Sequence, residues 1–280
     1  MDEMNSKDTQ APIRLRYNPC AIGPLIPGIV LPHVHDAIEI IFTTSGTATA
    51  ICNGIEYPQT PGSVFFAASN EVHYFTNRTP DTNGLVLDIE TVALLGGANQ
   101  FSQAVPAVHI WEDPEMKSKI WTIVNYMIDN ISTLDPSSVN LLSCSLLTLL
   151  LNHVELVPIS RDNKNIAKII TYCQEHFTEP LSLSILSDEL GLSVSYISRF
   201  FSNTFKMSFS DYINGLRLGE AIALLNDSKL TIAKISGRAG FPTIRTFNKA
   251  FLKHYGMTPS QYRKLDQKSN IEIVKKSKSK

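Results

Sequence analysis

The stretch "AGFPTIRTFNKAFLKHYGMTPSQYR", residues 239–263, decides how the C-terminal half of the chain folds. Its aromatic residues recur at helical spacing, with Phe247 and Phe251 four positions apart on one face. Hydrogen-bonding and basic residues, Arg245 and Asn248 among them, fall on the opposite face. Gly240 marks a turn just before this segment. The stretch therefore predicts an amphipathic helix after a short turn, with its polar face left exposed.

A related stretch precedes it by about 50 residues. Residues 183–205, "LSILSDELGLSVSYISRFFSNTF", resemble residues 232–255, "IAKISGRAGFPTIRTFNKAFLKHY". Each unit predicts a short amphipathic helix, a glycine-containing turn (Gly191, Gly240) and a longer helix that ends in aromatic residues. This is the helix-turn-helix pattern. Ser193 is placed to cap the second helix of the first unit.

In a helix-turn-helix motif the second helix enters the major groove of DNA, and its N-terminal residues reach base edges. One isolated helix with polar residues is as well explained by a solvated face, but two copies in register favour a nucleic-acid surface. The residues predicted to form the cores of the two units are Ile197, Phe200, Phe201, Phe247 and Phe251. The residues predicted to face DNA are Ser195, Ser198, Arg199, Arg245, Asn248 and Lys249. Arginine can bind guanine bidentately and asparagine can bind adenine.

Residues 209–227 read as one long helix between the two units. A rigid helix there would fix the units relative to each other. If both units face one side of a duplex, they occupy successive major grooves, roughly 34–36 Å apart.

Net charge supports a polyanionic partner for this half. The whole chain carries −1, but residues 1–162 contain 7 Lys/Arg and 17 Asp/Glu, which gives −10, and residues 163–280 contain 18 Lys/Arg and 9 Asp/Glu, which gives +9. The lysine-rich end "KKSKSK" accounts for part of the excess. Removing its four lysines still leaves +5, so the basic character extends beyond the tail.

The 280 residues suffice for two domains, and their composition is that of a globular protein. Four cysteines lie far apart without a CxxC pair, which favours a reduced, cytoplasmic setting. The N-terminus lacks the pattern of a signal peptide. The most apolar run, residues 141–151, is too short to span a bilayer. We therefore expect no membrane association.

The N-terminal half predicts an antiparallel sandwich or barrel. Residues 13–89 are rich in β-branched residues and are punctuated by turn signals, including "NG" at 53–54 and "TPGS" at 60–63. Two helices are predicted next, at 115–132 and 137–156. The second is apolar nearly all round, so it is either an ordinary core helix or a helix that also packs on a second subunit.

Residues 164–265 closely resemble the DNA-binding domain of the AraC/XylS family of bacterial transcription regulators. The matching segments are "LGLSVSYISRFF", "SFSDYINGLRLGEAIALL" and "AGF…FNKAFLKHYGMTPSQYR". The resemblance adds Ile244 to the base-facing positions named above. Ser187 and Ser236 stand where the family usually has alanine. Pro242 and Ile244 lie in a segment that is often polar, which bears on the base preference of the second unit.

Candidate ligand-binding residues gather in the stretch "LPHVHDAIEIIFTTSG" (31–46). His33, His35 and Glu39 occupy odd positions, so a regular strand would place them on one face. His73 can join them from another strand. Three imidazoles and a carboxylate suit Zn, Fe, Mn, Ni or Cu, and they can equally bind the hydroxyls of a small organic molecule.

The spacing of these residues resembles the cupin superfamily, whose two motifs would cover residues 28–77. The first motif, from His33 to Gly46, is intact. In the second motif Gly62, His73 and Asn77 fit, whereas Ala68 and Asn70 replace the usual Pro and Gly. AraC-type regulators of this layout carry such a domain as a sensor, and there the histidine pattern is generally taken to bind organic effectors.

The sequence thus predicts an α+β chain: an N-terminal antiparallel cupin-like β-barrel with helices, then an all-α domain with two helix-turn-helix motifs. The predicted segments are a sensor barrel with an N-terminal arm (1–112), a helical linker or dimerisation segment (113–156), a DNA-binding domain (164–265) and a basic disordered tail (266–280). A short connector (157–163) separates the two halves.

The predicted function is a sequence-specific transcription regulator controlled by a small effector, with carbohydrate as the favoured class. Its partners would be double-stranded DNA, the effector, a second copy of the chain and, as a further candidate, RNA polymerase. No enzymatic activity and no obligatory cofactor are expected. The alternatives are a metal-binding cupin sensor or metal-dependent cupin enzyme fused to a DNA-binding domain, with the same His33, His35, Glu39 and His73 as ligands, or a scaffold that never binds DNA.

Overall fold

The computed structural model describes residues 15–17, 20–24, 30–90, 104–111, 113–130, 133–227 and 229–264. These residues divide into two compact units, and the boundary in the sequence falls between Thr171 and Tyr172. The division falls inside helix α4 (Arg161–His176). The predicted basic tail and the first 14 residues of the predicted N-terminal arm lie outside the described residues.

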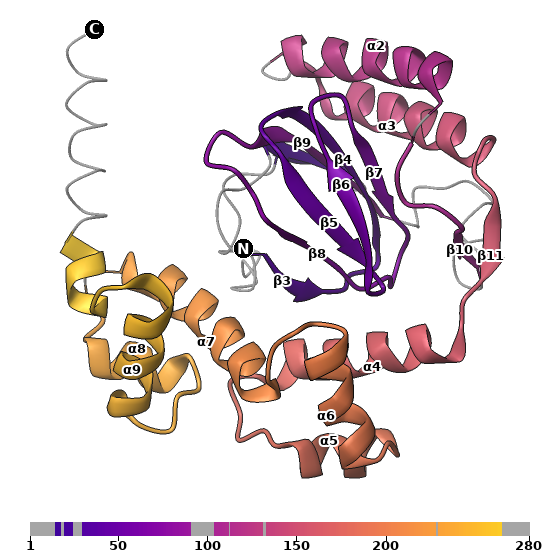
Figure 1. The fold of residues 1–280 in the computed structure, drawn as a ribbon. Helices are drawn as coiled ribbons and strands as arrows, with labels where there is room; N and C mark the ends of the chain where they lie inside the picture. The colour runs from indigo at the N-terminus through magenta and orange to yellow at the C-terminus, as the bar shows by residue number, and fades with distance from the viewer. Residues whose placement is uncertain are drawn as a thin grey trace, which may run out of the picture. The chain divides into compact units, whose positions relative to one another are not determined.

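The N-terminal unit contains two antiparallel sheets that form the predicted barrel (Figure 1). The five-stranded sheet has the order β1-β2-β9-β4-β7, formed by Leu15–Tyr17, Cys20–Pro24, Asn83–Glu90, Ala37–Ser45 and Val64–Ala67. The four-stranded sheet has the order β3-β8-β5-β6, formed by Val30–His33, His73–Thr76, Ala48–Cys52 and Ile55–Gln59.

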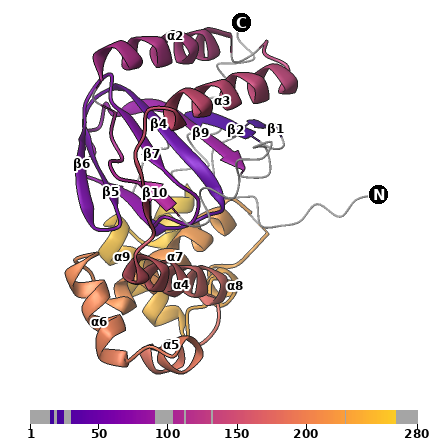
Figure 2. The ribbon, with the colours of Figure 1, turned by 90° about the vertical axis from the view of Figure 1, so that its right-hand side faces the viewer.

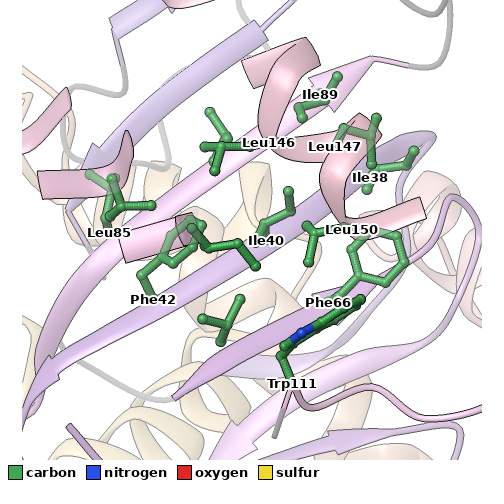
Figure 3. Close-up of a cluster of buried hydrophobic side chains, with 14 of the residues drawn as sticks. Ile38, Ile40, Phe42, Phe66, Leu85, Ile89, Trp111, Leu146, Leu147 and Leu150 are labelled. Atoms are coloured by element: carbon green, nitrogen blue, oxygen red, sulfur yellow. The ribbon is translucent and has the colours of Figure 1, made fainter. Parts of the chain in front are cut away.

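Strand β4 shows why this sheet has two different faces. Ile38, Ile40 and Phe42 belong to the apolar cluster that includes residues of helices α2 (Pro114–Asn130) and α3 (Pro136–Leu151) (Figure 3). Ile41 belongs instead to a second cluster, built from both sheets. Because side chains alternate along a strand, one face of the sheet packs on helices and the other lines the barrel interior. Glu39 shares the interior face with Ile41.

The turn predicted at "NG" joins β5 to β6. Asn53 has φ 49° and Gly54 has φ 85°, and Cys52 pairs with Ile55 across the turn. Two consecutive residues with positive φ are the requirement of the two-residue hairpin turn that matches strand twist. The predicted hairpin is confirmed.

Two helices cover the outer face of the five-stranded sheet (Figure 2). Helix α2 spans Pro114–Asn130 and helix α3 spans Pro136–Leu151. Asp135 caps α3 by accepting from two backbone amides, with Pro136 in the first turn. Most of the apolar residues of α3 pack into the core, but Leu141 is 71% exposed.

The predicted connector is partly a strand. Strand β11 (Leu156–Pro158) pairs antiparallel with β10 (Ala104–Pro106), and α4 begins at Arg161. A polar composition indicated an irregular linker, but backbone pairing with a distant segment makes Val157 and Pro158 extended. Leu156 is extended as well, so the predicted helix 137–156 is wrong at its end, because α3 stops at Leu151.

The C-terminal unit is helical, as predicted. After α4 come α5 (Leu183–Leu190), α6 (Val194–Asn203), α7 (Phe209–Leu225), α8 (Ile232–Arg238) and α9 (Ile244–Tyr255). All five residues predicted as core are buried: Ile197, Phe200, Phe201, Phe247 and Phe251. Among the described residues, no helix has the length and apolarity needed to cross a membrane.

Candidate functional sites: exposed reading helices and a buried His/Glu cluster

The first helix-turn-helix unit comprises α5 and α6. Ser193 caps α6 as predicted, because its side chain accepts from the amide of Tyr196. Gly191 ends α5 with φ 65°, and an added Cβ would meet nothing within 4 Å. Glycine is therefore favoured at position 191 because of the positive φ, and not because a side chain would clash with neighbouring atoms.

The second unit comprises α8 and α9. Thr243 and Thr246 form a reciprocal capping box at the start of α9. Gly240 has φ 84°, and a Cβ there would lie 2.5 Å from the backbone of Thr178. This glycine is required both by its conformation and by the close approach of the chain before α5.

Helix α7 connects the two helix-turn-helix units, and one of its side chains also contacts residues outside the helix. Arg217 donates to the carbonyls of Phe177 at 2.7 Å and Glu179 at 2.9 Å. Its guanidinium lies 5.9 Å from the ring centre of Phe241, which follows α8. One side chain therefore contacts the segment before the first unit and the turn of the second.

The seven predicted DNA-facing positions all lie on exposed surface of α6 and α9: Ser195, Ser198, Arg199, Ile244, Arg245, Asn248 and Lys249. The four on α9 border a surface hollow of about 680 Å³ that Leu252 and Pro259 also line. Arg199 donates from Nε to the carbonyl of Ser195 at 3.2 Å. Donors and amide groups on the exposed face of the second helix of each unit have the chemistry that base-edge recognition needs.

In the N-terminal unit His33, His35, Glu39 and His73 come together, which we call the His/Glu cluster. One ligand atom from each lies within 4.8 Å of those of the other three. The expected regular strand through the first three residues is wrong. His33 ends β3, His35 lies in the connection, and Glu39 belongs to β4 in the other sheet. The chain turns a corner here, so the cluster lies where the two sheets meet.

Each imidazole of this cluster is oriented by its own backbone contact. Nδ1 of His33 lies 3.0 Å from the carbonyl of Leu31, and Nδ1 of His35 lies 3.0 Å from that of Ala37. Nδ1 of His73 lies 2.8 Å from the carbonyl of Glu71. A carbonyl only accepts, so each Nδ1 carries its proton. In a neutral ring, Nε2 then presents a lone pair.

Glu39 is the acidic partner of two of these rings. Its carboxylate oxygens lie 3.2 Å from Nε2 of His73 and 3.6 Å from Nε2 of His35. Glu39 is only 3% exposed. Burial alone would raise the pKa of Glu39, but hydrogen bonds from His35 and His73 hold it well below its usual range.

The pKa values of the histidines separate their roles. Burial, with the neighbouring His73, lowers the pKa of His33 to about 3, so its ring is neutral at physiological pH. Burial also acts to lower the pKa of His35, but the hydrogen bond and charge of Glu39 outweigh it and raise that pKa above its ordinary value. The directions of these shifts favour a charged His35 opposite the Glu39 carboxylate, beside a neutral His33.

The donor set also fits a divalent metal ion. Histidines that bind metals characteristically donate their other ring nitrogen to a carbonyl or carboxylate, which fixes the tautomer that ligation needs. His33, His35 and His73 all have this arrangement, with Glu39 as a fourth ligand. A bound divalent ion would act as a Lewis acid toward oxygen groups of a ligand.

The aromatic side chains of the barrel strands divide between the two cores. Phe65 and Phe75 belong to the cluster inside the barrel. Phe42 and Phe66 pack on the helix side of the five-stranded sheet, while Tyr74 is buried at 5% exposure. Core packing is thus the role of at least Phe42 and Phe66, in line with the alternation of strand faces.

Sequence reasoning missed two further features of the barrel. Asp88 pairs with Glu39 across β9 and β4, and its charge also raises the pKa of His35. In the sequence, the only indication of this role of Asp88 was a polar residue between the apolar Leu87 and Ile89. The second feature is a buried group of Cys52, Glu71 and His109, which no spacing rule connects.

Known protein families match both halves of the chain. A family model described as a helix-turn-helix domain matches residues 186–265, and a cupin domain model matches residues 25–90. The HTH-type transcriptional activator RhaS of Enterobacter sp. (strain 638) is 24% identical over 257 residues, which are 88% of this chain and 92% of that protein. RhaS of Citrobacter koseri is 24% identical over 255 residues, with the same coverage of both chains.

Solved structures are similar as well. Unsaturated fatty acid-bound ToxT from Vibrio cholerae is 15% identical, covers 87% of this chain and 94% of its own, and superposes with a TM-score of 0.49. The C-terminal domain of AraT, a response regulator from Geobacillus stearothermophilus, is 32% identical over 38% of this chain and 88% of its own, with a TM-score of 0.36.

Fold, sites and relatives define a class: a DNA-binding transcription regulator with a cupin-like domain before paired helix-turn-helix motifs. Within that class, the chain is similar over 88% of its length to the HTH-type transcriptional activators RhaS, in line with the resemblance to the AraC/XylS family that its sequence motifs carry.

Proposed function

We propose that this regulator is cytoplasmic and is controlled by a small molecule bound at the His/Glu cluster inside the barrel. The observation that carries the proposal is the convergence of polar atoms from His33, His35, Glu39 and His73 in the barrel. An effector would act by binding one DNA-binding arrangement more tightly than another, because a ligand shifts an equilibrium only through differential affinity.

The chemistry of the cluster restricts the effector. Nε2 of His33 and the carboxylate of Glu39 are hydrogen-bond acceptors, since Nδ1 holds the imidazole proton. A site rich in acceptors binds hydroxyl donors or a cation. The hydroxyl class supports a carbohydrate or another polyol as effector.

Two partners complete the proposal. Operator DNA would be read by the exposed residues of α6 and α9. A second copy of the chain would pack on α3, where the side chain of Leu141 is 71% exposed. The relatives are named transcriptional activators, which favours activation, with RNA polymerase as the contacted partner.

A metal-binding sensor is the second candidate, favoured by the three oriented histidines. In this case the cluster would hold a divalent ion, and the ion itself or an oxygen ligand on it would be the signal. The same DNA-binding half would report the signal.

One experiment tests both candidates. Duplexes bound by the full-length protein are selected from a random pool, and fluorescence anisotropy then measures affinity for the selected site with sugars, sugar alcohols or divalent cations added. The His33→Ala/His35→Ala variant is the control. We expect an effector to change the wild-type affinity at least about fivefold, within the usual range of allosteric coupling, and to leave the variant unchanged. A response that survives in the variant would refute the assignment of the site.

Metal content separates the candidates. Protein purified without chelator is analysed beside the same double variant. About one ion per chain in the wild type, lost in the variant, would establish the metal sensor. Metal-free protein that responds to a polyol would establish the organic effector.

A further inference from the structure

A second polar cluster lies in the barrel and takes no part in the proposed function. It consists of Cys52 at the end of β5, Glu71 in the connection between β7 and β8, and His109 after β10. We call it the Cys52 cluster. Their exposures are 0%, 3% and 5%, and one ligand atom from each lies within 4.8 Å of the other two.

The carboxylate of Glu71 is held in place by outer hydrogen bonds. Asn53 donates from its side-chain amide to Oε1 at 2.8 Å, and the backbone amide of Ala68 donates to Oε2 at 2.9 Å. Such contacts fix the orientation of a carboxylate, and they are the kind of outer contact that supports metal ligands.

The ring of His109 is also fixed at both nitrogens. Nε2 lies 2.9 Å from both carboxylate oxygens of Glu71, and Nδ1 lies 3.0 Å from the hydroxyl of Tyr57. An ionised carboxylate only accepts, so Nε2 carries the proton in this state and the Tyr57 hydroxyl donates to Nδ1. Tyr57 can reverse its role, because a phenol hydroxyl can also accept.

We propose that Cys52, Glu71 and His109 form a second binding site in this chain, for a thiophilic divalent cation of the zinc type. The three side chains are a soft thiolate, an imidazole and a carboxylate, which are the three ligand types of protein zinc sites. A divalent ion with one thiolate and one carboxylate is electrically neutral. Neutrality matters here because an uncompensated charge in so buried a place is costly.

Binding requires one net proton to leave. The Cys52 thiol loses its proton to solvent and becomes the ligand. His109 stays neutral: its proton leaves Nε2, which binds the ion, while Nδ1 becomes protonated and donates to Tyr57. Glu71 exchanges its bond to His109 for the ion and keeps its bonds to Asn53 and Ala68.

The geometry needs only small adjustments: the 2.9 Å between Nε2 of His109 and the Glu71 oxygens must lengthen, while the distances to Sγ of Cys52 can shorten. Ligand atoms at about 2.0–2.3 Å from a tetrahedral zinc ion are about 3.3–3.8 Å apart, compared with the limit of 4.8 Å within this cluster. Rotation of the Cys52 side chain can supply the difference. Three protein ligands leave a fourth position for water or another ligand, as in zinc sites that keep an open position.

The two clusters are structurally connected. Cys52 is the direct cross-strand partner of His73, and the carbonyl of Glu71 is the group that orients His73 through Nδ1. Residues of the Cys52 cluster therefore position one member of the His/Glu cluster. The sites still differ in chemistry, because only the Cys52 cluster contains sulfur.

Cobalt(II) is the probe that separates them. Cobalt bound to a thiolate has an intense sulfur-to-metal absorption band in the near ultraviolet, which imidazole and carboxylate ligands do not produce. Titration of the full-length, reduced protein with cobalt should raise this band to a plateau at one cobalt per chain. Added zinc should then abolish it.

Matched variants assign the band. Cys52→Ser should remove it completely, and His109→Gln should weaken cobalt binding about tenfold or more. A variant that keeps Cys52 as its only cysteine (Cys20→Ser/Cys144→Ser/Cys173→Ala) should keep the band. So should His33→Ala/His35→Ala, which lacks the other cluster. Circular dichroism checks that each variant is folded.

Two results would overturn the proposal: a wild-type protein without a thiolate band at saturating cobalt, or a band that survives in Cys52→Ser. Neither result bears on effector control, which is read from DNA affinity. If control through the His/Glu cluster fails while the band behaves as expected, the second site stands by itself.

Discussion

The two units of this protein differ in where their candidate binding residues lie: on the surface in the helical unit and in the interior in the barrel. In the helical unit the residues predicted to read DNA are exposed, and the aromatic residues that hold α6 and α9 are buried. In the barrel the polar clusters are themselves largely buried. Under the proposed function, residues for binding and residues for stability are therefore separable by face in the helical unit, whereas in the barrel the same side chains would serve both purposes.

The strongest test of this difference is the removal of a large buried side chain from the core of the helical unit. Phe251 is fully buried and its ring lies 4.7 Å from that of Tyr255 and 5.6 Å from that of Phe247. Phe251→Ala should lower the free energy of unfolding by about 3–5 kcal/mol, through lost burial and a cavity. Urea denaturation followed by circular dichroism measures it. An effect below 1 kcal/mol would contradict the described packing of α9.

In the barrel a single polar change should affect stability and binding together. Glu39→Gln removes the charge opposite His35 and His73 and should cost about 1–3 kcal/mol, because buried polar partners lose their match. It should also abolish the response to effector or metal while leaving basal DNA affinity unchanged. Thermal unfolding and anisotropy, run on the same preparation, measure both effects. A variant of wild-type stability that also responds normally would contradict the role of the cluster.

In the helical unit an exposed change should affect binding alone. Arg245→Ala and Arg199→Ala should each weaken binding at the selected site by about 1–3 kcal/mol if the arginine reads a base, with no change in melting temperature. Lys119→Ala, on α2 of the other unit, is the control. Equal losses on selected and random duplexes would assign the arginines to phosphate contacts instead.

The smallest expected effect concerns a surface ion pair. Lys253 on α9 lies 2.7 Å from Asp211 on α7. Hydrogen bonds from Lys253 and Ser208 lower the pKa of Asp211 below its ordinary 3.8. The depressed pKa means that the stabilisation is present above 3.8 and is lost as pH falls through the folded-state value.

Because both side chains are largely exposed, Asp211→Asn should cost about 0.2–1 kcal/mol near neutral pH. The difference between wild type and variant should shrink in acid below pH 3.8. Denaturation at several pH values measures it, and a difference that grows in acid would be incompatible with this pair.

Most of the helical unit follows from local sequence. Ser193 and Thr243 as caps, Gly191 and Gly240 as turn residues and the four-residue spacing of aromatics are all signals within one segment. The helix bounds, the buried faces and the repeat were accordingly predictable. The barrel's hairpin at Asn53 was predictable for the same reason.

The arrangement inside the barrel is less accessible from sequence. The grouping of His33, His35, Glu39 and His73 was predicted, but from a regular strand that the structure replaces with a corner between sheets. The Cys52 cluster was not predicted, because its members come from segments that meet only after the sheets assemble. Strand β11 was missed for a similar reason, since the residues of β10 with which it pairs lie 50 to 54 positions earlier in the chain.

The pairing of β10 with β11 has a consequence for the modularity of the chain. Pro106 pairs with Leu156, and the amide of Ala107 donates to the carbonyl of Glu155 at 2.8 Å. The two ends of the segment 107–155, which includes α2 and α3, therefore lie side by side at the β10–β11 pair. Such a closed excursion can be exchanged between related proteins without shifting what precedes or follows it, provided that two features are kept. These are the apolar face toward β4 and the segment His109–Trp111, whose backbone bonds to β7. New assembly surfaces could then arise on α3 while the barrel interior and the DNA-reading helices stay unchanged.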